Sequence, residues 1–399
     1  MADKTNPKKS VRDLDLDGKR VFIRVDFHVP VSDGDVGDDT RIRAALPTIR
    51  LVKEKGGKVI LASHLGRPKG ERKPEYSLAP VSRRLAELLG EDVAFVDDCV
   101  GDKVAAAVAK LGRGQVLVLE NVRFYNGETK NDPEFAKRLA SLADDYVNEA
   151  FGTAHRAHAS TVGVPQVLGR GAAGLLIDKE LEALSRVLYH AEKPVVAIFG
   201  GAKVSDKIEV IENFLNLADR ILLGGGMAFT FFKAQGKEIG KSLLEEDKLD
   251  VAKSFLDEAR RKGIEFALPV DVVAAPRLEV GVESRVVSAD RIPADWMGLD
   301  IGPKTIADFK SKLDDAKTVI WNGPLGVFEI EQFAKGTLGI AEAVAASDAY
   351  TLIGGGDSVS AVKKAGVADK ISHISTGGGA SLEFLSGKQL PGIAVLTDK

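Results

Sequence analysis

The sequence has few of the features that mark secreted, membrane-bound or metal-clustered proteins. Cys99 is the single cysteine in 399 residues, which excludes an internal disulfide and a cysteine-based metal site and is typical of a reducing compartment. No apolar run approaches the ~18 residues that a membrane span requires, and residues 1–19 lack the apolar segment of a signal peptide. We therefore expect a cytoplasmic protein with no membrane partner, in which Cys99 is a buried apolar residue.

The chain also lacks a strong excess of charge of either sign. Its formal net charge of -3 gives no electrostatic basis for a nucleic-acid partner. The arginines are unevenly distributed, because 15 of the 22 precede residue 171. Guanidinium groups form two-point contacts with carboxylates and phosphates, so the first half suits a compact anion with several charges. A solvated charged surface would explain the same distribution.

Short β-branched runs alternate with amphipathic helical patterns along the chain. Strands are predicted at residues 21–26, 58–63, 93–96, 116–120, 145–148, 195–199, 221–223, 266–273, 319–321, 350–353 and 373–375. This alternation is typical of the α/β class, and the length exceeds that of one hydrophobic core. We expect two Rossmann-like parallel-sheet domains, residues 1–175 and 193–380, joined by an interdomain helix and hinge at 176–192.

The predicted strands of the two halves run into different residues. In the first half, polar and charged side chains follow the strands. In the second half, glycine-rich stretches follow them, at residues 200–201, 224–226, 323–326, 354–356 and 377–379. Ligands of open parallel sheets bind beyond the carboxyl ends of the strands. Glycine there lets backbone N–H groups reach phosphate oxygens at a helix N-terminus. The second half therefore predicts a nucleotide site, in which Asp357 is either a Mg²⁺ ligand or an ordinary helix N-cap.

Two other nucleotide signatures do not account for this pattern. The Walker motif G-x-x-x-x-G-K-[ST] is absent from the sequence. A G-x-G-x-x-G run does occur at residues 169–174, but the preceding residues 162–168 contain Gly163 and Pro165 and form no convincing strand. We interpret this run as unrelated to dinucleotide binding. A nicotinamide-dependent dehydrogenase and a non-catalytic binding protein remain as alternatives.

Six motifs, in order along the chain, resemble the signatures of the phosphoglycerate kinase family. They are RVDFHVP at 24–30, SHLGRP at 63–68, AFGTAHR at 150–156, GGAKVSDK at 200–207, WNGPLGVFE at 321–329 and GGGDS at 354–358. The likeness extends over residues 21–393. It implies reversible phosphoryl transfer between 1,3-bisphosphoglycerate and ADP, giving 3-phosphoglycerate and ATP in glycolysis, by a monomer that uses Mg²⁺.

The resemblance also assigns residues to each ligand. The 3-phosphoglycerate site of the N-terminal domain would comprise Asp26, His28, Arg41, His64, Leu65, Gly66, Arg67, Arg123 and Arg156. The nucleotide site of the C-terminal domain would comprise Gly201, Lys207, Gly298, Glu329, Gly355, Gly356, Asp357 and Ser358, with Asp357 toward the metal and Glu329 toward the ribose. Catalysis would fall to Arg41, Lys203 and the backbone of Gly378 and Gly379, and residues 381–399 would return to the N-terminal domain.

One position departs from the family pattern. The family usually has asparagine where this chain has His28, which is bulkier and titrates near neutral pH. An acyl phosphate has a carboxylate leaving group, and in the reverse direction the nucleophile is already a carboxylate. We therefore expect in-line transfer after hinge closure, with catalysis by alignment and charge stabilisation rather than by a general base.

Overall fold

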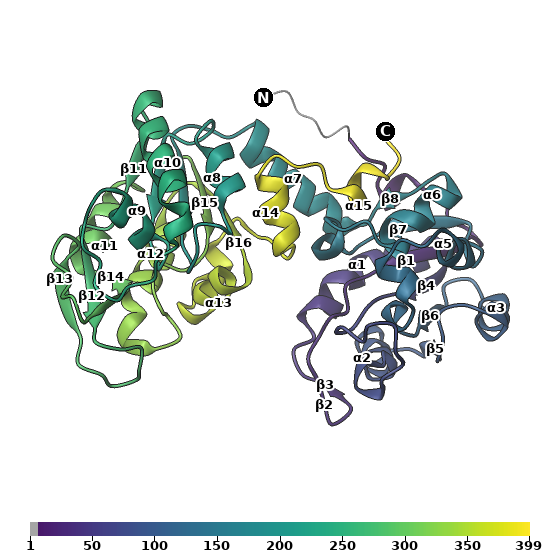
Figure 1. The fold of residues 1–399 in the computed structure, drawn as a ribbon. Helices are drawn as coiled ribbons and strands as arrows, with labels where there is room; N and C mark the ends of the chain where they lie inside the picture. Colours follow the sequence, from purple (N-terminus) through teal and green to yellow (C-terminus); the bar gives the residue numbers. More distant parts are fainter. Residues whose placement is uncertain (1–6) are drawn as a thin grey trace. The chain divides into compact units, whose positions relative to one another are not determined.

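The structure is a computed structural model that describes residues 7–399. Within this range the chain divides into two compact units (Figure 1). The first unit comprises residues 7–182 and Gln389–Lys399, and the second comprises Ala183–Lys388. Helix α7, Leu175–Tyr189, crosses the boundary, in the region where residues 176–192 were expected to form a helix.

The first unit is built on a six-stranded sheet with the strand order β5-β6-β4-β1-β7-β8. All its neighbouring strands are parallel. The bounds are Arg20–Arg24 for β1, Lys58–Ala62 for β4, Ala94–Val96 for β5, Val116–Leu119 for β6, Asp145–Asn148 for β7 and Ala172–Ala173 for β8. A short hairpin of β2, Val31–Ser32, and β3, Asp35–Val36, lies outside this sheet.

Besides α7, the described residues of the first unit form seven helices, several of which contact this sheet. They are α1, Thr40–Glu54; α2, Ala79–Leu89; α3, Asp102–Ala109; α4, Asn126–Thr129; α5, Pro133–Ala140; α6, Val164–Leu168; and α15, Pro391–Ala394. Ile42 and Ile49 of α1 and Leu85 of α2 share one core cluster with Val21 and Ile23 of β1. The first unit therefore has its own hydrophobic core.

The second unit repeats the plan with the strand order β11-β10-β9-β15-β16-β17, again with parallel pairs throughout. The bounds are Val195–Phe199 for β9, Arg220–Leu223 for β10, Glu265–Ala267 for β11, Thr318–Asn322 for β15, Tyr350–Gly354 for β16 and His373–Ile374 for β17. Successive strands are added first on one side of β9 and then on the other. The space between β9 and β15 is therefore the switch point at which this type of sheet binds ligands.

Seven further helices belong to the second unit. They are α8, Ile208–Phe214; α9, Ala228–Ala234; α10, Leu249–Lys262; α11, Pro303–Ser311; α12, Lys335–Ala346; α13, Gly356–Lys364; and α14, Gly379–Leu385. Phe309 of α11, Ile340 of α12 and Val362 of α13 pack in one cluster with the fully buried Trp321 of β15. The two-sheet α/β class predicted from the sequence is confirmed.

The strand predicted at residues 266–273 is wrong as a single element. β11 ends at Ala267 in the six-stranded sheet, and β12, Asp271–Ala275, belongs to a separate antiparallel sheet with the order β13-β12-β14. Pro269 lies between them and has no N–H to donate to a ladder, so the run cannot continue through it. β13, Arg285–Ser288, and β14, Met297–Ile301, were not predicted.

Near the C-terminus, the boundary between the two units lies at a later residue than expected. Residues 381–388 lie in the second unit, where Asn213 Nδ2 donates to Leu385 O at 2.7 Å and α14 contacts α8. Residues 389–399 join the first unit through backbone bonds from Gly392 N to Ala154 O and from Thr397 N to Gly171 O. The returning segment is therefore 389–399 rather than 381–399.

Two smaller predictions can also be compared with the structure. Cys99 is fully buried, as expected. The G-x-G-x-x-G run follows a helix, α6, rather than a strand, so it lacks the context of a dinucleotide fingerprint. In the part of the chain that the structure describes, no helix has the length and apolar character needed to cross a membrane.

Candidate active site

In the first unit, polar side chains gather where β1 and β4 end. Asp26 follows β1 and accepts hydrogen bonds from Arg41 Nη1 at 2.6 Å and from the backbone N–H of His28 at 3.3 Å. Arg41 projects from the first turn of α1. The carboxylate of Asp26 therefore holds the Arg41 guanidinium, which is half exposed, beside the strand ends.

His28 and His64 lie side by side at these two strand ends. Their rings stack, with centroids 5.4 Å apart and an interplanar angle of 12°. Burial lowers the pKa of His28; Asp26 opposes this effect, and Arg41, Arg123 and Arg67 reinforce it. The pKa of His64 lies well below its usual value, first because of burial and then because of Arg24.

The other predicted substrate residues surround this pair through the loops after β4, β6 and β7. Arg123 Nη1 donates to Gly66 O at 3.0 Å, and Asn121 Nδ2 donates to Leu65 O at 2.7 Å. Burial and the neighbouring Arg24 lower the pKa of Arg123 to about 10. Arg67 and Arg156 are exposed. The structure thus brings the predicted first-unit residues into one cationic surface with a single carboxylate, Asp26, among them.

A buried polar network lies beneath this surface. Arg24 is completely buried in β1 and donates from Nε to Ser160 Oγ at 2.7 Å and from Nη1 to Val25 O. Ser160 Oγ in turn donates to Glu128 Oε1 at 2.5 Å, and Glu128 is also fully buried. The third nitrogen, Arg24 Nη2, lies 3.1 Å from His64 Nδ1. This network fixes the guanidinium and, through it, the ring of His64.

In the second unit, backbone groups converge at the switch point between β9 and β15. Gly201 N donates to Pro324 O at 2.8 Å, and Gly225 N donates to Leu325 O at 3.0 Å. A Cβ atom at Gly200 would lie 2.1 Å from Pro324 O, so only glycine allows this approach. Three loops that follow different strands are thereby joined into one continuous backbone surface.

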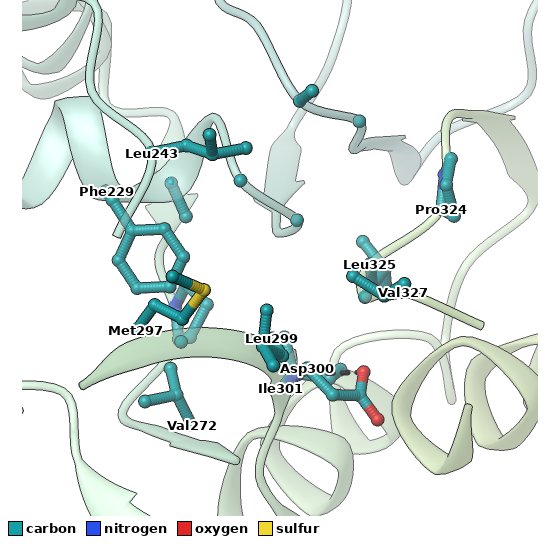
Figure 2. Close-up of a pocket in the computed structure, with 18 of the residues that line it drawn as sticks. Phe229, Leu243, Val272, Met297, Leu299, Asp300, Ile301, Pro324, Leu325 and Val327 are labelled. Atoms are coloured by element: carbon teal, nitrogen blue, oxygen red, sulfur yellow. Dashed lines mark hydrogen bonds between the residues drawn. The ribbon is translucent and has the colours of Figure 1, made fainter. Parts of the chain in front are cut away.

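These loops form one wall of a cavity of about 340 Å³. Figure 2 shows Phe229, Leu243 and Met297 on one side of the opening and Leu325 and Val327 on the other. Four of the predicted nucleotide residues also line it, namely Gly201, Gly298, Glu329 and Asp357. A mostly apolar cavity with a few polar groups at its margin is suited to a flat aromatic base.

The other predicted nucleotide residues lie around Asn322 and Gly323, at the end of β15. Lys207 Nζ donates to Asn322 Oδ1 at 2.6 Å, and Asn322 Nδ2 donates to Gly354 O at 2.9 Å. Ser358 Oγ accepts from Gly323 N at 2.6 Å. Burial lowers the pKa of Lys207, which Asp206 and Asp357 partly oppose. This polar group adjoins the start of α13, where Gly355 and Gly356 precede Asp357.

The remaining predicted catalytic residues do not line the cavity. Lys203 is an exposed side chain in the loop after β9. Gly378 is the N-cap of α14 with a φ of 52°, and Gly379 begins that helix. Their N–H groups stand at a helix N-terminus, which favours negative charge.

Asp357 suits Mg²⁺ only as part of a set that the nucleotide completes. It lies in the first turn of α13 and is exposed, and the N-cap is Gly355, so Asp357 does not have the alternative N-cap role. Across residues 7–399, no group of three or more His, Cys, Asp or Glu residues could hold a metal. Mg²⁺ is commonly held by one or two carboxylates together with substrate phosphates, and a single exposed Asp fits that arrangement.

Comparison with known proteins agrees with this geometry. The family model for phosphoglycerate kinase matches residues 11–388. A phosphoglycerate kinase of Thermosipho africanus (strain TCF52B) is 57% identical over 396 residues, which cover 98% of each chain. The chain belongs to the phosphoglycerate kinase family. It is therefore a kinase, the predicted reaction is that of its family, and the dehydrogenase alternative is wrong.

Solved structures of phosphoglycerate kinases share the fold over nearly the whole length. The enzyme from Coxiella burnetii matches with a TM-score of 0.90 and 45% identity, covering 98% of each chain. The enzyme from Pyrococcus horikoshii OT3 matches with a TM-score of 0.83 and 34% identity, covering 97% of this chain and 98% of the other.

Within this phosphoglycerate kinase fold, sequence reasoning missed the apolar walls of the cavity. Phe229, Met297, Leu299 and Leu325 line it, yet in the sequence each resembles an ordinary core residue. Asp300 was also missed; burial raises its pKa to about 8, and its Oδ2 accepts from Gly336 N in the first turn of α12 at 2.7 Å. One available signal was the glycine run at 224–226, which leads directly into α9 and Phe229, and another was Gly298, which stands between Met297 and Leu299.

Proposed function

We propose that the first unit binds 3-phosphoglycerate at the surface formed by Arg41, His28, His64 and the arginines around them. The observation that supports this is the convergence of several cations on a site with one nearby carboxylate, which is itself paired with Arg41. A small ligand with a carboxylate and a phosphate can satisfy these donors with two-point contacts.

The cavity of the second unit is the proposed nucleotide site. The base would lie among Phe229, Met297 and Leu299, and the ribose would lie near Glu329 at the margin. The phosphates would meet the N–H groups at the start of α13, whose dipole favours negative charge. Lys207 and Asp357 lie beside this helix start, where Mg²⁺ bound to Asp357 would offset phosphate charge.

The residues present account for the transfer without a general base. The nucleophile in the direction of acyl phosphate formation is a carboxylate, which carries no proton to remove. Arg41, Lys203 and the N–H groups of Gly378 and Gly379 would instead stabilise the charge on the transferring phosphoryl group. Their contribution is alignment and electrostatic stabilisation.

Because the two ligands are assigned to different units, transfer requires closure about a hinge near α7. In-line transfer needs the reacting atoms about 3–3.5 Å apart, and closure also excludes water that would hydrolyse an acyl phosphate. Each ligand alone should leave most molecules open, while the two together supply the contacts that favour the closed form.

Two measurements on the intact protein test these proposals. Turnover of 3-phosphoglycerate with ATP and Mg²⁺ tests the activity, and small-angle scattering tests the closure. The radius of gyration should fall most when both ligands are present, with smaller changes for either alone. An unchanged radius with both ligands at saturation contradicts the hinge and the assignment of one ligand to each unit.

A further inference from the structure

A cavity of the first unit lies at the opposite edge of the sheet from the proposed substrate site. Its volume is about 470 Å³. It is lined by Lys19, which precedes β1, by Asp145, the first residue of β7, and by Gly171, which precedes β8. These three strands are parallel neighbours, so the cavity stands at their amino ends, whereas the proposed substrate residues follow carboxyl ends of the same sheet. A strand of five residues, such as β1, separates the two edges by roughly 16 Å.

Three segments that are distant in sequence build the walls of this cavity. Lys9 N donates to Thr397 O at 2.8 Å, and Thr397 N donates to Gly171 O at 2.9 Å. Ala173 N in turn donates to Lys9 O at 2.8 Å. Gly169 and Gly171 of the G-x-G-x-x-G run belong to this wall, where Gly169 ends α6 with a φ of 65°. The run thus contributes to a cavity, although it lacks the context of a dinucleotide fingerprint.

Asp145 supplies a buried carboxylate that accepts no hydrogen bond from residues 7–399, although the residue is only 6% exposed. Its one ion pair in that range joins Oδ1 to Arg170 Nη1 at 3.6 Å, which is longer than a hydrogen bond. Neither oxygen is among the enclosed polar atoms that lack a partner, so both retain access to solvent where Asp145 lines the cavity. Burial raises the pKa of Asp145, which Arg170 and Lys19 partly oppose. A donor from a ligand would therefore stabilise this carboxylate.

Groups of both signs surround this carboxylate at the margin of the cavity. Lys9 and Lys19 are exposed, and in the described part of the chain neither ammonium group forms an ion pair or a hydrogen bond. Thr397 Oγ1 accepts from Gly171 N at 3.1 Å, which leaves its own proton for an acceptor in the cavity. Asp15 adds an exposed carboxylate. The cavity therefore offers acceptors to a cationic group and donors to an anionic one.

We propose that this cavity is a second ligand site, which binds a small zwitterion with its ammonium group on Asp145 and its acidic group on Lys9 and Lys19. A cation alone would leave the two lysines unpaired, and an anion alone would leave Asp145 without a donor. Asp13, also at the margin, does not enter this balance because Ser10 N and Lys399 Nζ already occupy its carboxylate. Since the segment 389–399 forms part of the wall, the ligand would also hold it on the first unit.

A purely structural pairing of Asp145 with Arg170 makes a different prediction. Arg170 alone would then neutralise the carboxylate, and the charges at the margin would be solvated surface groups. No small molecule would distinguish Asp145 from an exposed aspartate, and a zwitterion would bind no better than a molecule with one charge.

The binding test therefore compares zwitterions with analogues that carry one charge, by calorimetry on the intact protein. Glycine, 4-aminobutyrate and 6-aminohexanoate vary the distance between the two charges, and n-butylamine and butyrate each carry one of them. The best-bound amino acid should have a Kd at least about tenfold lower than either analogue. Equal affinity for all probes, or no binding by any of the three amino acids, overturns the proposal.

Substitutions then locate the bound amino acid. Asp145→Asn keeps the size of the side chain but removes its charge, so the Kd should rise about tenfold or more, while Asp92→Asn, at an exposed position outside the cavity, should leave it unchanged. Lys19→Gln alters an exposed residue that the fold tolerates, and it should weaken the amino acid but not n-butylamine. Saturating 3-phosphoglycerate should not displace the probe. Unchanged affinity in Asp145→Asn or Lys19→Gln, or displacement by 3-phosphoglycerate, overturns the site.

Discussion

The strands of the first unit end in side chains that carry charge, whereas those of the second end in glycine. In the first unit, β1 and β4 lead into Asp26, His28, His64 and Arg67. In the second unit, β9, β10 and β15 lead into loops whose backbones contact one another directly. The same position in the same type of sheet therefore presents side-chain cations in one case and backbone amides in the other. Side chains suit a small anion that can be surrounded, and glycine backbone suits a long ligand that must lie close to the chain.

The two units are alike in how they stabilise the starts of their helices. In each unit a buried carboxylate that lies in a strand or directly after one accepts a hydrogen bond from a backbone N–H at the start of a helix. The N-cap residue of that helix makes no side-chain capping bond of its own. Glu149 accepts from Leu176 N of α7, and Asp300 accepts from Gly336 N of α12. Burial raises the pKa of each to about 8. The ligand chemistry differs between the units, but the scaffold beneath it is held in the same way.

The largest expected effect is that of substituting Lys203. This substitution tests whether the glycine amides of the second unit alone can stabilise the transition state. Lys203→Ala should lower kcat by about 100-fold or more, since a charge needed mainly in the transition state is lost. The Kd of the nucleotide should change little. Steady-state kinetics and calorimetry measure both, with Lys253→Ala on the exposed face of α10 as the control. A kcat within about threefold of the parent would show that the amides suffice.

A smaller effect is expected from Gly356→Ala, which tests the backbone contact itself. A Cβ atom at Gly356 meets nothing within 4 Å, and its backbone is not in the left-handed region, so the fold should be unaffected. The methyl group would instead obstruct a phosphate at the start of α13 and raise the Kd of Mg-ADP about tenfold. Gly339→Ala in α12 is the matched control, where the nearest atom lies at an ordinary 3.4 Å. An unaltered Kd would place the phosphates elsewhere.

The smallest expected effect concerns the shared scaffold and is a change in the pH dependence of stability. The pKa of Glu149 is about 8 in the folded state and its usual value is 4.5, so the folded state binds the proton more tightly. Glu149 therefore makes its full contribution to the free energy of unfolding below about pH 4.5, and this contribution is lost as the pH rises through about 8. Glu149→Gln should reduce the loss of unfolding free energy between about pH 5 and 6 by on the order of 1 kcal/mol.

Asp300→Asn offers the matching test in the second unit. Its pKa is raised in the same direction, so denaturant titrations of both variants should show a flatter pH profile than the parent. An unchanged profile in either variant would mean that the folded state does not bind a proton on the corresponding carboxylate more tightly than the unfolded state does.

Much of this architecture could be predicted because its signals are local. Most of the parallel strands are apolar runs, and the residues that follow each strand are adjacent to it in sequence. His28 and His64 could therefore be assigned to one edge of the sheet before their stacking was seen. The exposed strand β13 could not, because Arg285 and Val286 face solvent and show no buried pattern. Its pairing with β12 depends on contacts between distant residues.

The parts of the site that escaped prediction also depend on distant contacts. Phe229 and Met297 lie on the same side of the cavity but come from different elements, and nothing local distinguishes them from core residues. Glu149 accepts a bond from Thr48 Oγ1, 101 positions earlier in the chain. Such a pair follows from the packing of α1 against the sheet, which a linear reading of strand and helix patterns does not provide.

The return of residues 389–399 to the first unit has a consequence for the nascent chain. These residues leave the ribosome after all of 183–388, so the second unit can complete its fold while the first still lacks its final segment. Domains usually fold in the order of synthesis, and here that order is inverted for the last step. Until then Gly171 and Ala154 lack their backbone partners, and Asn148 Nδ2, one residue before Glu149, lacks the carbonyl of Gly392. The first unit is thus finished last, only once residues 389–399 have been made.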